Sequence, residues 1–564
     1  MLQSLKKLFA ATILVGSVLL SSAAFAQTAE ELTNPDPADW PTYGRTLDMH
    51  RFSPLDQIDA DNVDDMRLAW SRGLEFVIDA QFSPTVYQGT MYVNGADRVV
   101  ALDAATGDQI WSYVVELDEN TDSLTRDRSR GGPVVYDGKV FHALGDGRVV
   151  ALDRMTGEEI WSTQVGDISL AEGFSSAPIF ADGKIILGPS GADTGGSSGR
   201  VVAADVETGE IMWTFNTVPQ PGEPGFETWS PPSAAQYGGG SAWVPGAYDP
   251  ESNTVIYGVG QPIPWWAGSQ RQGDNLYTSS WVALDGATGE LKWYHQVVPQ
   301  DEWDLDQIAT PMVVDVDLED MGERRVAVLP TVTGFLVWVD VETGEFLKYE
   351  QYMPEVTIHT GYEPDGTPII DDSYRWTDES QAGESRLVCG FRWVDFEPAA
   401  YSPETDLYYR PNSYDCIDLA QGPRPDDWQP GESAINITGF TALPDRFERV
   451  GGISAIDLKT GDIAWEFGTE YSQRSGVTAT AGGLVFMGSP DRHFRAFDAA
   501  TGEVLFDQVL PAYISANPIT YAVDGKQYVA IPVGGQGGIV IYRSSDSAPV
   551  VTSDVSLFVF ALPD

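Results

Sequence analysis

The feature that most constrains the fold of this 564-residue chain is a short motif that recurs along it. Each copy reads small–apolar–Asp–x–x–Thr–Gly–acidic–x–x–aromatic, as in Ala101–Trp111. The other copies are Ala151–Trp161, Ala203–Trp213, Ala283–Trp293, Ala455–Trp465 and Ala496–Phe506, and a looser copy, Trp338–Tyr349, has its aromatic residue one position late. The pattern is typical of a β-hairpin, in which Asp caps the turn and Gly supplies a positive φ. The aromatic residue at a fixed offset can then dock between neighbouring sheets.

The spacing of these copies predicts one repetitive domain, although the length alone would suggest several. Most copies are about 40 to 55 residues apart, which suits one four-stranded blade. Two longer gaps contain the strand–turn–strand variants Ala247–Tyr257 and Ala400–Tyr409. We therefore predict an all-β fold, a single eight-bladed β-propeller over residues 27–564. The segment Ser556–Ala561 is expected to close the ring against N-terminal chain.

The first 26 residues have the pattern of a secretory signal peptide. Lys6 and Lys7 precede an apolar run from Leu8 to Leu20, and Ala24–Ala26 has the form of a cleavage site. Cleavage after Ala26 would give an exported, periplasmic protein. A membrane anchor is the weaker alternative, since the apolar run is short. No later stretch of the chain is expected to span a bilayer.

Charge and cysteine content narrow the function further. The chain has 33 Lys and Arg against 83 Asp and Glu, a formal net charge of −50, which argues against binding nucleic acid through a basic face. This acidity indicates either a solvated surface or attraction of a basic partner such as a small cytochrome. The five His are scattered, and no Cys-x-x-Cys-His occurs, so covalent haem is not expected. In an oxidising compartment, Cys389 and Cys416 are predicted to form a disulfide.

The repeat resembles the tryptophan-docking motif of pyrroloquinoline quinone (PQQ) dehydrogenases. The resemblance extends from about Trp40 to the terminal segment at Val559 and is nearest to the soluble branch that contains sorbose and sorbosone dehydrogenases. Non-catalytic propellers carry the same repeat, so the motifs of the site decide more. A protein-binding propeller scaffold is therefore retained as the alternative function.

The segment Asp301–Asp306 resembles the acidic metal loop of this family. The resemblance implies that Asp304 is the catalytic base beside the metal. Calcium enzymes usually have a small neutral residue two positions later, whereas lanthanide enzymes have an additional Asp, which corresponds to Asp306. A trivalent hard cation favours one more anionic oxygen. An ordinary acidic loop is the competing interpretation.

Two further segments and four single residues resemble the parts of the family that bind PQQ. Gly188–Asp193 resembles the Gly-x-Ser-Gly-Ala-Glu segment, which implies that Ser190, Gly191 and Ala192 lie under one face of the quinone and that Asp193 is a metal ligand. Gly238–Trp243 implies that Trp243 stacks on the other face and that Ser241 bonds a carboxylate. The remaining implied contacts are Arg130, which suits a carboxylate, and Ser175, Gln81 and Asp395.

Three positions depart from the family pattern. The second metal ligand, an Asn in the family, corresponds to Gln261, whose amide oxygen lies one carbon further out. The Arg or Lys expected near the reactive quinone oxygen corresponds to Val332, and we hypothesise that Arg474 supplies the missing charge. The adjacent Cys pair of methanol dehydrogenases is absent.

Taken together, the resemblance implies a PQQ-dependent alcohol dehydrogenase with one metal ion, a lanthanide(III) or Ca²⁺. Asp193, Gln261, Asp304 and Asp306 would hold the metal, and Asp304 would take the alcohol proton. Electrons would leave to a separate acceptor such as a periplasmic cytochrome c. The segment Pro264–Trp266 favours a bulky or secondary alcohol, for instance a sugar, a polyol or a cyclic alcohol.

Overall fold

The structure is a computed structural model that describes residues 29–74, 79–265, 268–319, 321–376, 379–390, 396–422, 427–433, 437–535 and 549–564. The predicted signal peptide and Asp395 therefore lie outside the described residues. Within them, strands dominate, and no helix is long and apolar enough to cross a membrane.

Antiparallel sheets follow one another along the chain, each a meander of consecutive strands. The first three sheets are β4 (Thr85–Tyr87), β5 (Thr90–Gly95), β6 (Arg98–Asp103) and β7 (Gln109–Val114); β9 (Val134–Tyr136), β10 (Lys139–Ala143), β11 (Arg148–Asp153) and β12 (Glu159–Gln164); and β13 (Ile179–Ala181), β14 (Lys184–Leu187), β15 (Arg200–Asp205) and β16 (Ile211–Asn216). The next two are β17 (Ala247–Asp249), β18 (Thr254–Gly258), β19 (Ser280–Asp285) and β20 (Leu291–Gln296); and β21 (Met312–Leu318), β22 (Gly322–Pro330), β23 (Phe335–Asp340) and β24 (Phe346–Gln351).

The C-terminal third contributes further sheets of the same kind. They are β28 (Ala400–Ser402), β29 (Leu407–Ser413), β32 (Gly451–Asp457) and β33 (Ile463–Thr469); β34 (Val477–Thr480), β35 (Leu484–Gly488), β36 (His493–Asp498) and β37 (Val504–Val509), with β1 (Phe52–Ser53) added in parallel; and β38 (Ile519–Val523), β39 (Lys526–Gly535) and β40 (Ser553–Ala561), with β2 (Arg67–Gly73) at the edge. The smaller sheets pair β3 (Asp79–Ala80) with β8 (Arg128–Ser129), β25 (His359–Tyr362) with β26 (Pro368–Ile370), and β27 (Ser385–Cys389) with β30 (Cys416–Gln421) and β31 (Ile437–Ala442).

Helices are short and lie in the connections. The α-helices are α1 (Ala29–Thr33), α2 (Ser123–Arg126) and α3 (Ala192–Gly195). The 3-10 turns are η1 (Val63–Asp65), η2 (Ile168–Leu170), η3 (Phe226–Thr228), η4 (Pro232–Tyr237), η5 (Gly268–Gln270), η6 (Asp372–Tyr374), η7 (Glu379–Gln381) and η8 (Pro444–Arg446).

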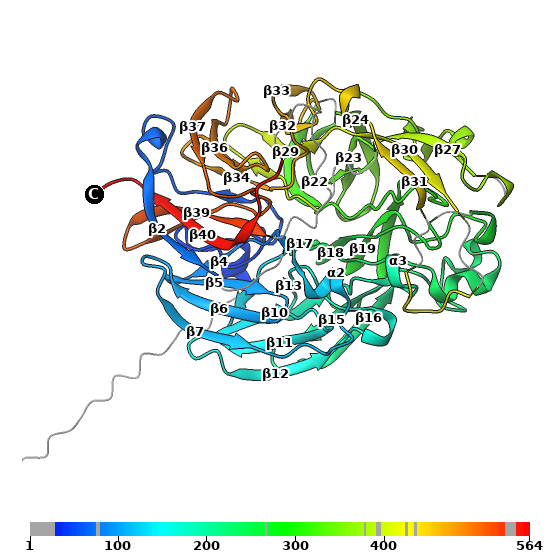
Figure 1. Ribbon diagram of the computed structural model, residues 1–564, viewed down its shortest axis with the longest axis horizontal. Coiled ribbons are helices and arrows are strands. Elements are labelled where there is room, and N and C mark those ends of the chain that lie inside the picture. Colours follow the sequence, from blue (N-terminus) through cyan, green and yellow to red (C-terminus); the bar gives the residue numbers. More distant parts are fainter. Residues whose placement is uncertain are drawn as a thin grey trace, which may run out of the picture.

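The sheets form a ring. Figure 1 shows them succeeding one another round the molecule in the order of the colours, until red β40 lies beside blue β2. The first strands of neighbouring sheets contact one another, as β13 does β17 and β17 does β21. β40 pairs antiparallel with β2, with Phe558 opposite Ser71, so the C-terminal strand closes the ring against N-terminal chain as predicted.

The repeated motif forms the hairpin that its sequence predicts. In the first copy, Oδ1 of Asp103 accepts hydrogen bonds from the backbone N–H groups of Ala105 and Thr106, each 2.9 Å long, and Gly107 has φ of +78°. Trp111 then lies opposite Ala101 on the outer strand. The same Asp-capped turn recurs at Asp153, Asp205, Asp285, Asp457 and Asp498.

Each docking tryptophan packs on the turn glycine of the next sheet. A methyl group added at Gly157 would lie 2.5 Å from the Trp111 ring, so only glycine leaves room for it. The indole of Trp111 also donates to the carbonyl of Arg154 at 3.0 Å. The same pairing holds for Trp161 with Gly209, Trp213 with Gly289, Trp293 with Gly344, Trp465 with Gly502 and, outside the predicted repeats, Trp70 with Gly107.

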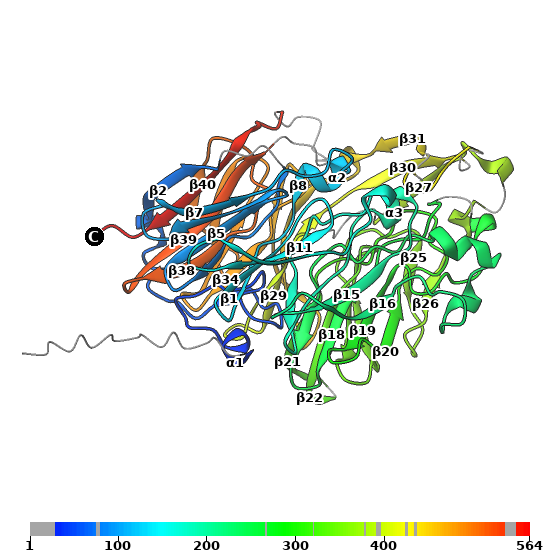
Figure 2. The same cartoon turned by 90° about the horizontal axis from the view of Figure 1, so that it is seen from below.

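The looser copy, Trp338–Tyr349, forms a different seam, that is, a different contact between its own sheet and the next. Lys348, not an aromatic residue, lies opposite Trp338, and its ammonium donates to the carbonyl of Thr460 in the next sheet at 2.6 Å. Tyr349 instead packs against Tyr362 of β25, with ring centroids 5.1 Å apart. The one-residue displacement therefore redirects the aromatic ring to the other face of the strand. Figure 2 shows β25 and β26 on the side of the molecule that also carries β20.

Candidate active site

A cavity of about 220 Å³ lies where loops from successive sheets converge. Its lining residues come from β8 and from the connections before or after β13, β14, β17, β18, β20 and β22. They are Arg128, Arg130, Ser175, Ser190, Gly191, Asp193, Thr194, Trp243, Gln261, Trp265, Asp304, Asp306 and Val332. All four predicted metal ligands are therefore together, although the sequence separates them widely.

The carboxylates of Asp193 and Asp306 both lie beside the backbone of Gly260. A methyl group added at Gly260 would lie 2.8 Å from Oδ2 of Asp193 and 2.9 Å from Oδ1 of Asp306. Beside them, Oε1 of the buried Gln261 has no hydrogen-bond partner within the described part of the chain. An unpartnered buried amide oxygen next to two carboxylates is costly unless a ligand satisfies it. Hard cations take such oxygen donors, so these residues fit a metal ion.

Asp193 is held in position from two sides. Ser241 Oγ donates to Asp193 Oδ1 at 2.7 Å, and the indole of Trp265 donates to the Asp193 carbonyl at 2.8 Å. Burial raises the pKa of the Asp193 carboxyl, and the Ser241 hydrogen bond only partly offsets this effect. A bound cation would favour the charged form that burial opposes. Ser241 does not line the cavity and acts on Asp193 from behind.

The loop that carries Asp304 and Asp306 is organised by Asp301. Oδ1 of Asp301 accepts from the N–H of Trp303 at 2.7 Å and Oδ2 from that of Leu305 at 2.8 Å. Asp304 has φ of +64°, a left-handed conformation that is costly for a residue with a side chain. Asp306 accepts from the N–H of Gln261 at 2.6 Å. Asp301 is thus structural, whereas Asp304 and Asp306 face the cavity.

Arg130 lies against the aromatic side of the cavity. Its guanidinium is 4.4 Å from the ring centroid of Trp243 and 4.8 Å from that of Phe396. Its Nε donates to Oε1 of Gln81 at 2.8 Å, and Nε2 of Gln81 is buried without a partner in the described residues. This arrangement places an oriented cation beside an indole face, which suits a flat, anionic aromatic ligand.

Three further predicted contacts, Ser175, Ser190 and Gly191, also line the cavity, and the backbone N–H of Arg130 donates to the carbonyl of Ser175. Ser175 and Ser190 share a hydrogen bond of 3.1 Å, and Gly191 has φ of +107°. A side chain at Gly191 would collide with the carbonyl of Ala171. Ala192 begins α3 and is buried.

Arg474 is not among the residues that line the cavity. Arg474 is buried and forms an ion pair of 3.0 Å with the equally buried Glu397. It lies 6.0 Å from the Phe396 ring, the ring that Arg130 also contacts. Val332, at the position where a cation was expected, does line the cavity.

Sequence reasoning missed Arg128, which lines the same cavity. It is two residues before Arg130, and residues at i and i+2 of an extended segment point to the same side. The spacing of two residues between Arg128 and Arg130 could have pointed to Arg128, but only the pairing of β3 with β8 shows that this segment is extended.

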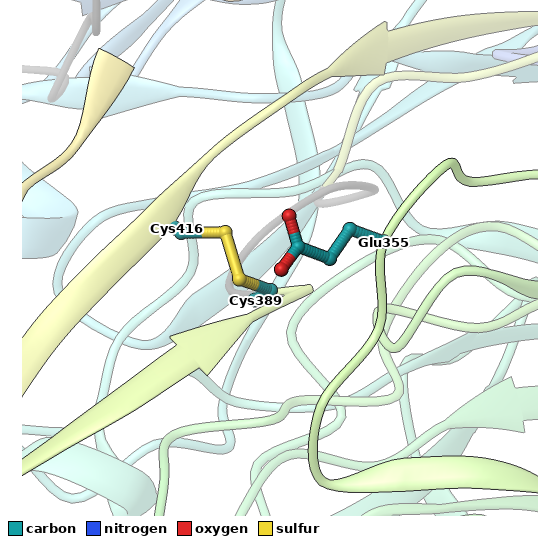
Figure 3. A group of neighbouring side chains, drawn as sticks. All are labelled: Glu355, Cys389 and Cys416. Carbon is teal, nitrogen blue, oxygen red and sulfur yellow. A yellow bond between two sulfur atoms is a disulfide. The ribbon is translucent and has the colours of Figure 1, made fainter. Parts of the chain in front are cut away.

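One other group of metal-type side chains occurs in the described residues: Glu355, Cys389 and Cys416 (Figure 3). The two sulfurs form a disulfide with the Cα atoms 4.1 Å apart, which confirms the predicted pair and removes both thiolates as ligands. This group therefore does not compete with the cavity as a metal centre.

The comparisons with known proteins agree with this geometry. The profile of the PQQ glucose/ethanol/alcohol dehydrogenase β-propeller domain matches residues 40–358 and 450–529. The chain belongs to the PQQ-dependent alcohol dehydrogenase family. The quinoprotein alcohol dehydrogenase PedH of Pseudomonas putida is 32% identical over 95% of this chain and 93% of its own length. The putative dehydrogenase XoxF of Paracoccus denitrificans is 33% identical over 87% of this chain and 86% of its own.

Solved structures give the same assignment. A europium-containing methanol dehydrogenase superposes with a TM-score of 0.85 at 27% identity, covering 94% of this chain and all of that one. The quinohemoprotein alcohol dehydrogenase of Comamonas testosteroni gives a TM-score of 0.82 at 30% identity, covering 93% of this chain and 80% of that one. This PQQ dehydrogenase is therefore an enzyme that oxidises alcohols with PQQ and one metal ion, Ca²⁺ or a lanthanide. The scaffold alternative is set aside.

Proposed function

We propose that this chain is a periplasmic dehydrogenase that oxidises a bulky or secondary alcohol to an aldehyde or ketone and passes the electrons to a cytochrome c. The observation that carries the proposal is the convergence of Asp193 and Asp306 beside the buried amide oxygen of Gln261, which has no hydrogen-bond partner among the residues that the structure describes. We further propose that residues 27–564 form a single eight-bladed propeller, that residues 1–26 are removed, and that the metal in the cell is a lanthanide.

The predicted site residues would divide into two groups, one that holds the metal and one that holds PQQ. Asp193, Gln261, Asp304 and Asp306 would hold the metal. Arg130, Ser175, Ser190, Gly191 and Trp243 would hold PQQ, supported by Gln81, Ala192, Ser241 and Asp395. When bound, PQQ supplies a quinone that accepts the reducing equivalents, and the metal acts as a Lewis acid.

Two residues of the chain would supply the base and the positive charge in the cavity. Asp304 would accept the hydroxyl proton of the alcohol at a carboxylate oxygen, because it lines the cavity. Arg128 lines the cavity together with Val332, so it is better placed than Arg474 to supply positive charge there.

The substrate class is proposed from the aromatic wall. Trp265 lines the cavity and packs in a cluster with Ile263, Trp428 and Ile437. Such a wall favours an apolar, bulky alcohol over methanol. Trp266, which the sequence also suggested, lies outside the described residues.

The proposal for the acceptor and the compartment rests on the sequence. The chain has no Cys-x-x-Cys-His motif for its own haem, and its net charge of −50 suits a basic partner. The signal-peptide pattern and the disulfide both favour an oxidising compartment outside the cytoplasm.

The test is reconstitution of metal-free apoprotein with PQQ and calcium, PQQ and lanthanum, or PQQ alone, followed by dye-linked oxidation of a panel of alcohols. Turnover of secondary or cyclic alcohols only with lanthanum is the expected result. Turnover with calcium alone would remove the proposed role of Asp306. A preference for methanol would overturn the substrate class.

A further inference from the structure

The outer side of the acidic loop Asp301–Asp306 is covered by a segment that the repeats do not include. Glu302 is the point of contact: its carbonyl accepts from Nε2 of Gln421 at 2.8 Å, and its Oε2 accepts from the N–H of Trp376 at 3.0 Å. The indole of Trp303 donates to the carbonyl of Tyr374 at 3.2 Å. The loop is therefore bonded on one side to the core and on the other to this added segment.

Gln421 reaches Glu302 because of the register of β30. Ile417, Leu419 and Gln421 lie on one face of the strand, and all three are almost fully buried. Ile417 and Leu419 pack in the same hydrophobic cluster as Trp303 and Leu305 of the acidic loop. A slip of one residue would turn this row away from the loop and place Asp418 and Ala420 against it.

A covalent bond fixes that register. Cys389 at the end of β27 is directly opposite Cys416 at the start of β30, and the two are joined by the disulfide. At the other end of the same ladder, Ser385 is opposite Ala420, next to Gln421. The disulfide thus closes one end of the β27–β30 ladder, and the other end holds the acidic loop.

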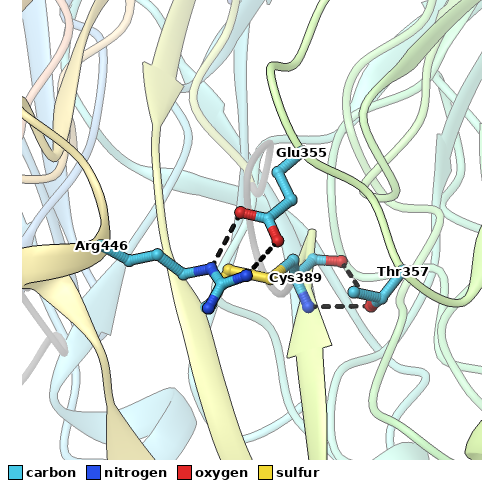
Figure 4. The surroundings of a disulfide bond; sticks show 5 residues. Glu355, Thr357, Cys389 and Arg446 are labelled. Carbon is cyan, nitrogen blue, oxygen red and sulfur yellow. Dashed lines mark hydrogen bonds and ion pairs between the residues drawn. A yellow bond between two sulfur atoms is a disulfide. The ribbon is translucent and has the colours of Figure 1, made fainter.

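The disulfide end is itself anchored (Figure 4). Thr357 Oγ1 accepts from the N–H of Cys389 at 2.9 Å and donates to its carbonyl at 3.2 Å. Beside it, Oε2 of Glu355 accepts from Nε of Arg446 at 2.8 Å. These two hydrogen bonds of Thr357 to the Cys389 backbone therefore give the ladder a fixed base from which to position the loop.

We propose that the β27–β30 ladder is a clamp that positions Asp304 and Asp306, with Gln421 as the positioning residue and the Cys389–Cys416 disulfide as the bond that sets its register. The inference rests on the proposed role of these two aspartates as metal ligands. Groups that orient metal ligands from behind commonly change metal affinity by about 10- to 100-fold when removed. The clamp should therefore tighten metal binding without touching the metal.

Two variants break the clamp at different ends. Gln421→Met keeps the length of the side chain and removes the donor to Glu302. The double variant Cys389→Ser/Cys416→Ser removes the disulfide without leaving a thiol. Glu355→Gln is the matched control, because it disrupts the ion pair beside the disulfide and leaves the ladder and Gln421 intact.

The first measurement is amide hydrogen exchange of the apoprotein in a peptide that covers residues 302–306. The N–H groups of Trp303 and Leu305 are bonded to Asp301, so their exchange reports on the loop directly. The second is titration of the apoprotein with terbium in the presence of PQQ, followed by terbium luminescence. Neither readout requires turnover.

We expect Gln421→Met and the double cysteine variant to raise exchange in residues 302–306 and to weaken terbium binding by about 10-fold, with the control like the wild type. Unchanged exchange and affinity in Gln421→Met would overturn the clamp, and so would an equal effect in Glu355→Gln. If the double variant does not fold, Gln421→Met alone decides. A wild type that binds no terbium would refute the proposed function, while the exchange data would still judge the clamp.

Discussion

At the outer rim of the ring, each docking tryptophan packs on the turn glycine of the next sheet, and its indole is bonded to a backbone carbonyl. At the centre, the Asp193 and Asp306 carboxylates lie beside the Gln261 amide oxygen, which is buried and has no hydrogen-bond partner among the described residues. Asp304 also lies there, on left-handed backbone. The comparison indicates that the rim supplies the stability that the centre gives up.

The largest expected effect tests the centre. Asp304→Ala should lower turnover by about 1,000-fold or more, because loss of a general base costs that order of rate. The thermal midpoint of the metal-free apoprotein should stay close to that of the wild type, since the change removes one buried carboxylate and no apolar packing. Steady-state kinetics of the loaded enzyme and a melting curve of the apoprotein check both. Activity close to that of the wild type would refute the assignment of the base.

The rim gives the converse prediction. Trp213→Ala should lower the free energy of unfolding by about 3 kcal/mol, because a large buried ring is lost, while the turnover of the folded enzyme is retained. Denaturant unfolding measures this loss. The matched change is Lys348→Ala, at the seam where no tryptophan docks. It should cost less, about 1 kcal/mol, because one hydrogen bond to Thr460 is lost and no ring is removed. Equal losses at the two seams would show that docking does not distinguish them.

Asp306 is expected to make the site bind a lanthanide in preference to calcium. Asp306→Ala should weaken lanthanum binding in the presence of PQQ by about 10-fold or more, because a trivalent ion loses one anionic ligand, and should affect calcium binding less. Competition with terbium luminescence measures both affinities. A similar loss for calcium would mean that Asp306 does not select the metal.

The last prediction concerns pH and the seam at His295 on β20, next to the Lys348 seam. Burial lowers the pKa of His295 to about 4 and that of His359 to about 3. The unfolded state takes up protons near the ordinary pKa of about 6.5, and the folded state does so only well below it. Stability should therefore fall as the pH drops from about 6.5 towards 4, by about 1.4 kcal/mol per pH unit for each histidine.

The His295→Phe variant tests this sign, because His295 already packs flat on Phe346. The unfolding free energy of the variant should fall less steeply with decreasing pH than that of the wild type, by about 1.4 kcal/mol per pH unit. The reason is that the variant lacks one group that takes up a proton on unfolding. Unfolding free energies measured between pH 4 and 7 provide the check, and parallel curves would contradict the buried, neutral state of His295.

The same contrast explains what the sequence could predict. The rim was predictable because one motif encodes each hairpin locally, from the Asp cap to the glycine. Trp70 escaped because it lies on β2, which has no such turn and finds its sheet only through β40. Only the resemblance predicted that Asp193, Gln261, Asp304 and Asp306 would lie near one another. All four line one cavity, and their role as metal ligands stays a prediction.

Contacts made over long sequence distances were not predictable. Glu397 neutralises Arg474, and nothing local to either residue announces that ion pair. Arg128 is recognisable as part of the cavity only after β8 has paired with β3. The bond from Gln421 to Glu302 depends on the register of a ladder that lies outside the repeats.

The pairing of β2 with β40 has a consequence for how the molecule is made. β2 leaves the ribosome early, but its partner strand is among the last parts of the chain to be synthesised. Until β40 has been made, the strand β2 that carries Trp70 has no partner strand in its sheet. The ring must therefore stay open until β40 has been made, so an agent that keeps β40 from pairing with β2 would keep the ring from closing.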